Sequence, residues 1–148
     1  MTQIVSARHT ALVVKDLDVS RAFYCDFLGL ETLSFATEQG KYIETLVGLS
    51  GATLRWVKIK VPGGHLVELI EYLNPRCTIL PEELGRPNRP GFSHLAFTVV
   101  DIDMLHANMV SAGYKCNWPP QLSPDGRVKV MYAHDPDGNI LEMVQEVK

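Results

Sequence analysis

The chain repeats itself, and the repeat carries chemically distinctive residues. A histidine that opens an apolar alternating run, His9, recurs at an offset of 85 residues as His94. A glutamate inside a glycine-led apolar run, Glu68, recurs at an offset of 74 residues as Glu142. The offsets differ because the first half carries a longer middle segment. Since matching chemistry stands at both ends of the repeat, we interpret the chain as two related halves.

Each half has the same predicted order of elements. Apolar residues that alternate along each histidine-led run predict an opening strand. Asp16 and Asp101 then stand at expected helix N-caps. The helices are predicted over 17–28 and 102–112, and the further strands over 31–36, 53–61 and 65–72 in the first half and over 115–118, 128–134 and 140–147 in the second. The pattern predicts an α+β fold of tandem βαβββ modules.

The predicted boundaries follow from proline and from length. A chain of 148 residues with 46% hydrophobic content is sufficient for one compact domain, 1–148. Four prolines between residues 74 and 91 indicate an irregular connection. We therefore expect module one over about 4–73, the connection over about 74–91 and module two over about 92–147. A short additional helix is expected within 41–51.

The composition excludes several functional classes. Charged residues make up 21% of the chain, the net charge is only -3, and no basic run is present, which argues against a nucleic-acid partner. No apolar stretch reaches the roughly 20 residues of a membrane helix, and no signal peptide is recognisable. The three cysteines, Cys25, Cys77 and Cys116, lack a C-x-x-C pairing. They are typical of reduced thiols, so we expect a cytoplasmic protein.

The repeated histidines and glutamates are candidate metal ligands. Strand alternation places each of them on an apolar face, where an unpaired carboxylate is costly and a compensating charge is expected. Any one of them alone is more often a hydrogen-bonded core histidine or a solvated glutamate. Their recurrence at equivalent positions favours a divalent-metal site between the halves. Its predicted ligands are His9, Glu68, His94 and Glu142.

The donor set restricts the metal without selecting one. Two imidazoles and two carboxylates suit Ni, Co, Mn, Fe or Zn and leave coordination positions open for a substrate. The absence of thiolate ligands argues against a structural zinc site. The other histidines are weaker candidates. We expect His65 to face away from Glu68 and His106 to lie at the surface. We expect His134 either to lie at the surface or to contact a metal ligand without binding the metal itself.

Longer motifs resemble a known family. They are His9 with Val14-Lys-Asp-Leu17, the run Phe23-Tyr-Cys-Asp-Phe-Leu-Gly-Leu30, Leu66-Val-Glu-Leu-Ile70, His94-Leu-Ala-Phe97, and Asp135-Pro-Asp-Gly138 before Leu141-Glu142. Together they resemble the vicinal oxygen chelate superfamily, which contains glyoxalases, bleomycin-resistance proteins and dioxygenases. The resemblance covers nearly the whole chain and implies that the tandem modules form a cupped mixed sheet.

Within that superfamily, the His/Glu/His/Glu set is most similar to glyoxalase I (lactoylglutathione lyase) and to methylmalonyl-CoA epimerase. The resemblance implies a lyase or isomerase that abstracts a proton beside a carbonyl and holds the enediolate on the metal. Glu142 or Glu68 would be the catalytic base, and all four residues would be ligands. It also implies a small-molecule substrate and a homodimer, with the metal site within one chain or between chains.

The sequence departs from glyoxalase I at two positions. Val13 stands where that enzyme has an arginine for the glutathione carboxylate, and Tyr72 replaces an asparagine. Both argue against glutathione hemithioacetal as substrate. Arg55 and Arg127 are weighed as other anion contacts against the simpler interpretation of solvated strand ends, and Trp56 as cover for an edge or a subunit contact.

Three alternatives to this function remain open. An extradiol-type dioxygenase would use Fe(II) on His9, His94 and Glu142, and would leave Glu68 superfluous. A non-catalytic small-molecule binding or resistance protein usually lacks the four ligands. A fosfomycin-type thiol transferase prefers histidine at the position of Glu68.

Overall fold

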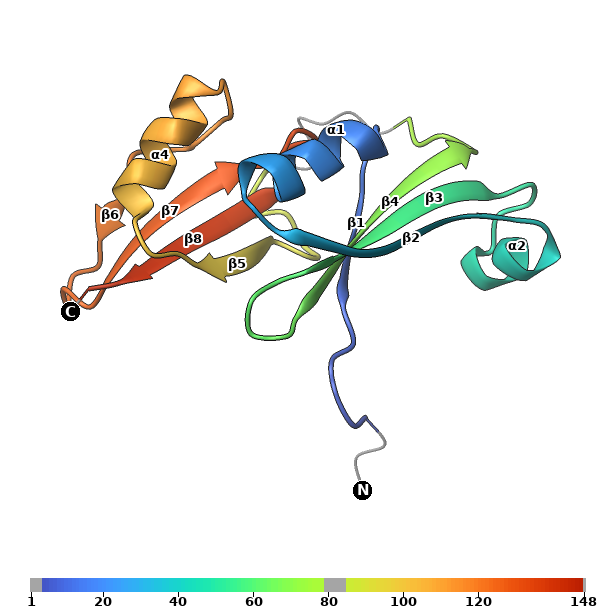
Figure 1. The fold of residues 1–148 in the computed structure, drawn as a ribbon, viewed down its shortest axis with the longest axis horizontal. Coiled ribbons are helices and arrows are strands. Elements are labelled where there is room, and N and C mark those ends of the chain that lie inside the picture. The colour runs from blue at the N-terminus through green and yellow to red at the C-terminus, as the bar shows by residue number, and fades with distance from the viewer. Residues whose placement is uncertain (1–3, 79–84, 148) are drawn as a thin grey trace. The chain divides into compact units, whose positions relative to one another are not determined.

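The structure, a computed structural model, describes residues 4–78 and 85–147 (Figure 1). It divides into two compact units, residues 1–78 and 79–148. Each contains one four-stranded mixed sheet and a helix that follows the first strand. The prediction of an α+β fold with tandem βαβββ modules is therefore confirmed. No helix in the described part of the chain is long and apolar enough to cross a membrane.

In module one the first strand lies at one edge of the sheet, beside the last strand. Strand β1 pairs in parallel with β4, and the β4–β3 and β3–β2 pairs are antiparallel, in the order β1-β4-β3-β2. Its elements are β1 (Thr10–Val13), α1 (Leu17–Arg21), the π-helical segment η1 (Ala22–Phe27), β2 (Glu31–Gln39), α2 (Lys41–Val47), β3 (Thr53–Lys60) and β4 (Leu66–Asn74).

Module two repeats this topology. Strand β5 pairs in parallel with β8, the β8–β7 and β7–β6 pairs are antiparallel, and the order is β5-β8-β7-β6. Its elements are β5 (His94–Thr98), α4 (Ile102–Ser111), β6 (Gln121–Leu122), β7 (Val128–His134) and β8 (Ile140–Glu146).

The predicted helix starts are confirmed. The Asp16 carboxylate accepts hydrogen bonds from the backbone N–H groups of Asp18 (3.0 Å) and Val19 (3.1 Å). Asp101 accepts one from Met104 at 2.9 Å. These bonds satisfy amide groups that have no partner within the helix. The short helix expected within 41–51 is α2.

The predicted strand over 115–118 is wrong. In that segment only Cys116 forms a bridge, with Ala133, and the short strand β6 begins after the prolines. Proline has no N–H to donate to a ladder, so Pro119 and Pro120 interrupt the pairing with β7. In the predicted connection, residues 75–78 and 85–91 contain no helix or strand, and 79–84 lie outside the described residues.

The two faces of each sheet differ in burial. Val67 and Leu69 are fully buried on the face of β4 that carries Glu71, and Glu71 contacts the start of α1. Helix α1 thus covers that face, and α4 packs against β7 and β8 in the same way. Because side chains alternate along a strand, Glu68 and Glu142 lie on the faces opposite these helices. Both are only partly buried.

Candidate functional site

Module one brings its predicted histidine and glutamate together. The parallel register places Glu68 of β4 opposite Ala11 of β1, two residues after His9 and on the same strand face. His9 Nε2 lies 3.1 Å from Glu68 Oε2, and the two side chains are 28% and 13% exposed. One nitrogen and one oxygen that could bind a metal ion therefore lie side by side.

Module two builds the equivalent pair in the equivalent register. Glu142 of β8 lies opposite Ala96 of β5, two residues after His94. His94 Nε2 lies 3.2 Å from Glu142 Oε2. The repeat seen in the sequence is thus also a repeat of side-chain geometry.

The outer nitrogens of the two histidines have different surroundings. His94 Nδ1 lies 3.1 Å from Ser93 Oγ and 3.4 Å from Tyr132 Oη, and the Tyr132 ring is 5.2 Å from the imidazole. His9 Nδ1 is buried and has no hydrogen-bond partner among the described residues. A partner on the outer nitrogen fixes the orientation of a ligating imidazole. His94 is therefore better oriented than His9.

A lysine that sequence reasoning did not include lies beside Glu68. Lys58 of β3 is the cross-strand partner of Glu68, and its Nζ lies 3.6 Å from Glu68 Oε1. The same Nζ lies over the Trp56 ring, 4.7 Å from the centroid. In module two the residue opposite Glu142 is Tyr132. The offset of 74 residues relates Lys58 to Tyr132, and because the two residues differ in charge, the repeat carried no signal for a cation at this position.

Each module contributes two possible metal-binding atoms, one imidazole nitrogen and one carboxylate oxygen. No group of three or more His, Cys, Asp or Glu side chains that could hold a metal ion occurs among residues 4–78 and 85–147. The four-ligand arrangement therefore stays a prediction, supported by the two pairs.

Comparison with known proteins gives the family. The profile of the glyoxalase/bleomycin resistance protein/dioxygenase superfamily matches residues 6–143. The chain belongs to this superfamily. The match spans both modules and includes all four predicted ligands.

Individual relatives within the superfamily are distant. The chain is 31% identical to the uncharacterized protein YaeR of Escherichia coli, over 99% of this chain and all of that protein. It is 28% identical to a probable lactoylglutathione lyase of Synechocystis sp., over 93% of this chain and 92% of that one. A crystal structure of a glyoxalase family protein from Bacillus cereus has the same fold, with a TM-score of 0.87 at 21% identity over 99% of this chain and 97% of that chain.

In this superfamily member, the helix-covered faces carry a second set of equivalent contacts. Glu71 Oε2 accepts a hydrogen bond from the Leu17 backbone N–H at 3.2 Å. Gln145 Oε1 accepts one from the Ile102 N–H at 2.8 Å. Each module thus uses a side chain of its last strand to hold the first residue of its helix, where no backbone partner exists.

Arg55 belongs to this contact set in module one. It donates to Glu71 Oε2 from Nε (3.1 Å) and Nη2 (2.5 Å), and both Nη atoms lie 3.2 Å from Asp18 Oδ2. The hydrogen bond to Glu71 is the main reason that the pKa of Arg55 is raised. In module two, Lys129 pairs with Asp103 at the equivalent positions.

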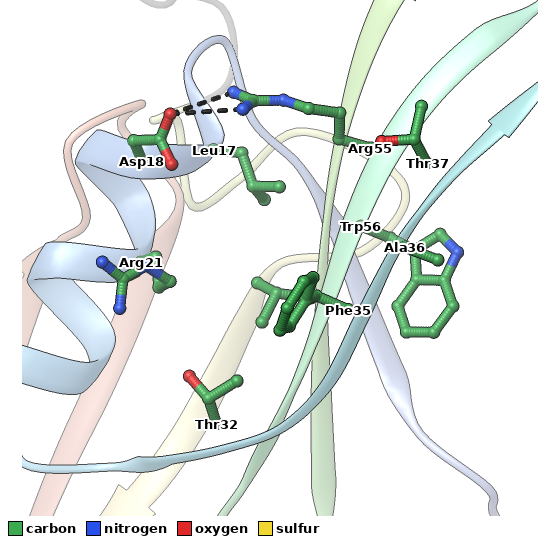
Figure 2. A pocket seen from close by; sticks show the side chains of 10 residues that line it. Leu17, Asp18, Arg21, Thr32, Phe35, Ala36, Thr37, Arg55 and Trp56 are labelled. Carbon is green, nitrogen blue, oxygen red and sulfur yellow. Dashed lines mark hydrogen bonds and ion pairs between the residues drawn. The ribbon is translucent and has the colours of Figure 1, made fainter.

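A cleft of about 580 Å³ lies next to Arg55, between α1 and strands β2 and β3. Figure 2 shows the Arg55 guanidinium turned to Asp18 of α1, with Arg21 and Phe35 along the same cleft. Arg55 alternates with Trp56, which neighbours Lys58 and lies on the other face. Arg55 is thus a structural ion-pair partner on the helix side, away from the Glu68 face.

Hydrogen bonds define the positions of His65 and His134. His65 Nε2 lies 3.0 Å from Thr10 Oγ1, and Thr10 alternates with His9, so His65 faces away as predicted. A surface position for His134 is wrong, because it is 3% exposed. Its Nε2 contacts Asn117 at 2.7 Å and its Nδ1 contacts the Gly138 carbonyl at 3.2 Å. Burial lowers the pKa of His134.

Proposed function

We propose that the chain is a divalent-metal-dependent lyase or isomerase of the glyoxalase I or epimerase type. His9, Glu68, His94 and Glu142 together would hold one Ni, Co, Mn, Fe or Zn ion. The observation that carries the proposal is the pairing of a histidine nitrogen with a glutamate oxygen in the same register in both modules. Superfamily membership adds support.

The donor chemistry fits such an ion. Each pair presents an imidazole nitrogen and a carboxylate oxygen at 3.1 to 3.2 Å, a mixed set that suits these metals. Two carboxylates also balance the charge of a divalent cation. When bound, the metal supplies a Lewis acid that stabilises negative charge on the carbonyl oxygen of a substrate.

We assign the base to Glu142. Proton uptake by Glu68 would break its ion pair with Lys58, whereas the cross-strand neighbour of Glu142 is the neutral phenol Tyr132. Glu142 is thus freer to take a proton from the carbon beside the carbonyl and return it to the substrate. Glu68 would remain a ligand paired with Lys58, and His94 would be held in orientation by Ser93 and Tyr132.

The substrate is proposed to be a small carbonyl compound other than the glutathione hemithioacetal. At the position of the glutathione-binding arginine, Val13 is half-exposed and offers no cation. We further propose that the protein is cytoplasmic and forms a homodimer, because members of the superfamily often dimerise.

The metal content of the protein tests this proposal. Metal-free protein is reconstituted with Ni, Co, Mn, Fe or Zn, and bound metal is measured together with its affinity. We expect stoichiometric metal, and a loss of affinity of about 10- to 100-fold or more in Glu68→Ala and in Glu142→Ala. His65→Ala, a histidine on the other face, is the matched control and should bind metal normally.

Either of two outcomes overturns the metal site: no stoichiometric metal, or unchanged affinity in both glutamate variants. Activity assays then discriminate the reactions. Turnover of methylglyoxal with glutathione by the Ni or Co form would restore glutathione as a substrate component. Oxygen consumption with catechols by the Fe(II) form would favour the dioxygenase.

A further inference from the structure

We propose that Lys58 binds an oxyanion group of the substrate, so that the substrate class is small carbonyl compounds that carry a carboxylate or a comparable anion. This inference rests on the proposed function and goes beyond it, because it adds a specificity-determining residue outside the four predicted ligands. It depends on where Lys58 lies, how it is held and what it leaves unpaired.

Lys58 is held in place on the Glu68 face of the sheet. Its side chain is only 25% exposed, which is unusual for a lysine, and its Nζ is shared between Glu68 and the Trp56 ring. Trp56 is itself anchored, because its Nε1 donates to Glu38 Oε1 at 3.3 Å. The ammonium group therefore has a defined position beside the predicted metal ligand.

The charge balance favours an arriving anion. In the proposed site, the carboxylates of Glu68 and Glu142 would balance the charge of a divalent cation, so the ammonium of Lys58 would add one positive charge that they do not compensate. Lys58 has three donors, and the described contacts use one carboxylate oxygen and one aromatic face. An anionic group bound beside Glu68 would pair with the remaining donors.

Neighbouring cations do not share this position. Lys60, the next residue on the same strand face, lies at the end of β3 and pairs with Glu31 at 3.4 Å. The equivalent position in module two is Tyr132, which carries no positive charge. The anionic group of the substrate is thus assigned to Lys58, beside Glu68, and has no equivalent partner in module two.

The test uses two chelating probes that differ in charge, oxalate and acetohydroxamate, on metal-loaded protein. Calorimetric titration measures the affinity of each for the wild type, Lys58→Met and the matched control Lys60→Met. We expect Lys58→Met to weaken oxalate binding by about 10- to 100-fold, the range of a charge-assisted hydrogen bond, and acetohydroxamate binding much less. Lys60→Met should bind both as the wild type does.

Metal stoichiometry is measured before any probe is added, which separates the two proposals. If the protein takes up metal but Lys58→Met binds oxalate as tightly as the wild type, the role of Lys58 is overturned and the metal site stands. The role is also overturned if the loaded wild type binds neither probe, or if both probes weaken equally. A protein without metal overturns the proposed function and this inference with it.

Discussion

On the helix side of module one the last strand carries a carboxylate, Glu71, whereas the equivalent residue of module two is the neutral amide Gln145. Both accept a hydrogen bond from the first residue of a helix. Only Glu71 also binds arginines: Arg55, which joins it to Asp18, and Arg76, whose Nη2 lies 3.5 Å from Glu71 Oε1. The two modules thus keep the same backbone contact with different electrostatics.

The face that carries the histidine–glutamate pairs shows the same kind of difference. Both modules pair a histidine with a glutamate at nearly equal distances. The residue opposite the glutamate is a cation in module one, Lys58, and a phenol in module two, Tyr132. The comparison teaches that the two modules share the positions of the histidine and glutamate, while the side chains around each pair differ and make the two carboxylates unequal.

The largest expected effect tests whether the two carboxylates are unequal in catalysis. Hydroxypyruvate serves as a probe because it is a small carbonyl compound that carries a carboxylate. Glu142→Gln should lower the rate of its C3–H exchange in D2O by about 100-fold or more, because the substitution removes the proposed base. Glu68→Gln should lower it by less than about 10-fold once metal is saturating. Proton NMR measures the exchange. Equal losses, or a larger loss in Glu68→Gln, would contradict the assignment of Glu142.

The next effect concerns stability on the helix side. Glu71→Ala leaves the Leu17 N–H and the Arg55 guanidinium without their buried acceptor, so we expect a loss of about 3 kcal/mol in the free energy of unfolding. Gln145→Ala removes one neutral acceptor and should cost about 1 kcal/mol. Urea unfolding measures both. Similar losses in the two variants would show that the arginine contact adds nothing.

The smallest effect is a dependence on pH that belongs to module two. Burial lowers the pKa of His134 in the folded protein, so the unfolded chain takes up its proton first as the pH falls below the ordinary value of about 6.5. The contribution of His134 to the free energy of unfolding is therefore fully present above about pH 6.5. It declines as the pH falls from there toward the lower pKa of the folded protein. The equivalent residue of module one, Lys60, is exposed and has no such role.

His134→Gln should remove this component. Unfolding free energies of metal-free wild type and variant are measured at pH 7.5 and 5.5, and the wild type should lose more stability between the two. The quantity of interest is the change with pH, so an overall loss of stability in the variant does not affect the result. An identical change in both proteins would be evidence against the burial effect.

Much of the fold could be predicted because its signals are local. Alternating apolar runs, N-cap aspartates such as Asp16 and Asp101, and proline clusters act within a few residues of the elements they define. The pairing of His9 with Glu68 could also be predicted, because both residues recur in the second half of the chain. The predicted strand over 115–118 was wrong because Pro119 and Pro120, which have no N–H to donate, interrupt the pairing with β7.

Other features depended on contacts that no local pattern encodes. Lys58 entered the site because the antiparallel register of β3 and β4 sets it opposite Glu68. His134 is buried because the chain at 115–117 runs beside the end of β7, with the His134 N–H donating to the Lys115 carbonyl at 2.9 Å. Arg55 lies on the helix side because alternation along β3 separates it from Lys58.

The sequence by itself determined that this protein consists of two related βαβββ modules, each with one histidine and one glutamate at matching positions. Periodicity and repetition are properties of the chain, so they can be recognised without coordinates. Tertiary structure alone decided which side chains surround those pairs: Lys58 beside Glu68, Tyr132 beside His94, and Arg55 bound to Glu71. The physical reason is that strand register and helix packing bring together residues that are distant in the chain, and their charges then distinguish two otherwise equivalent pairs.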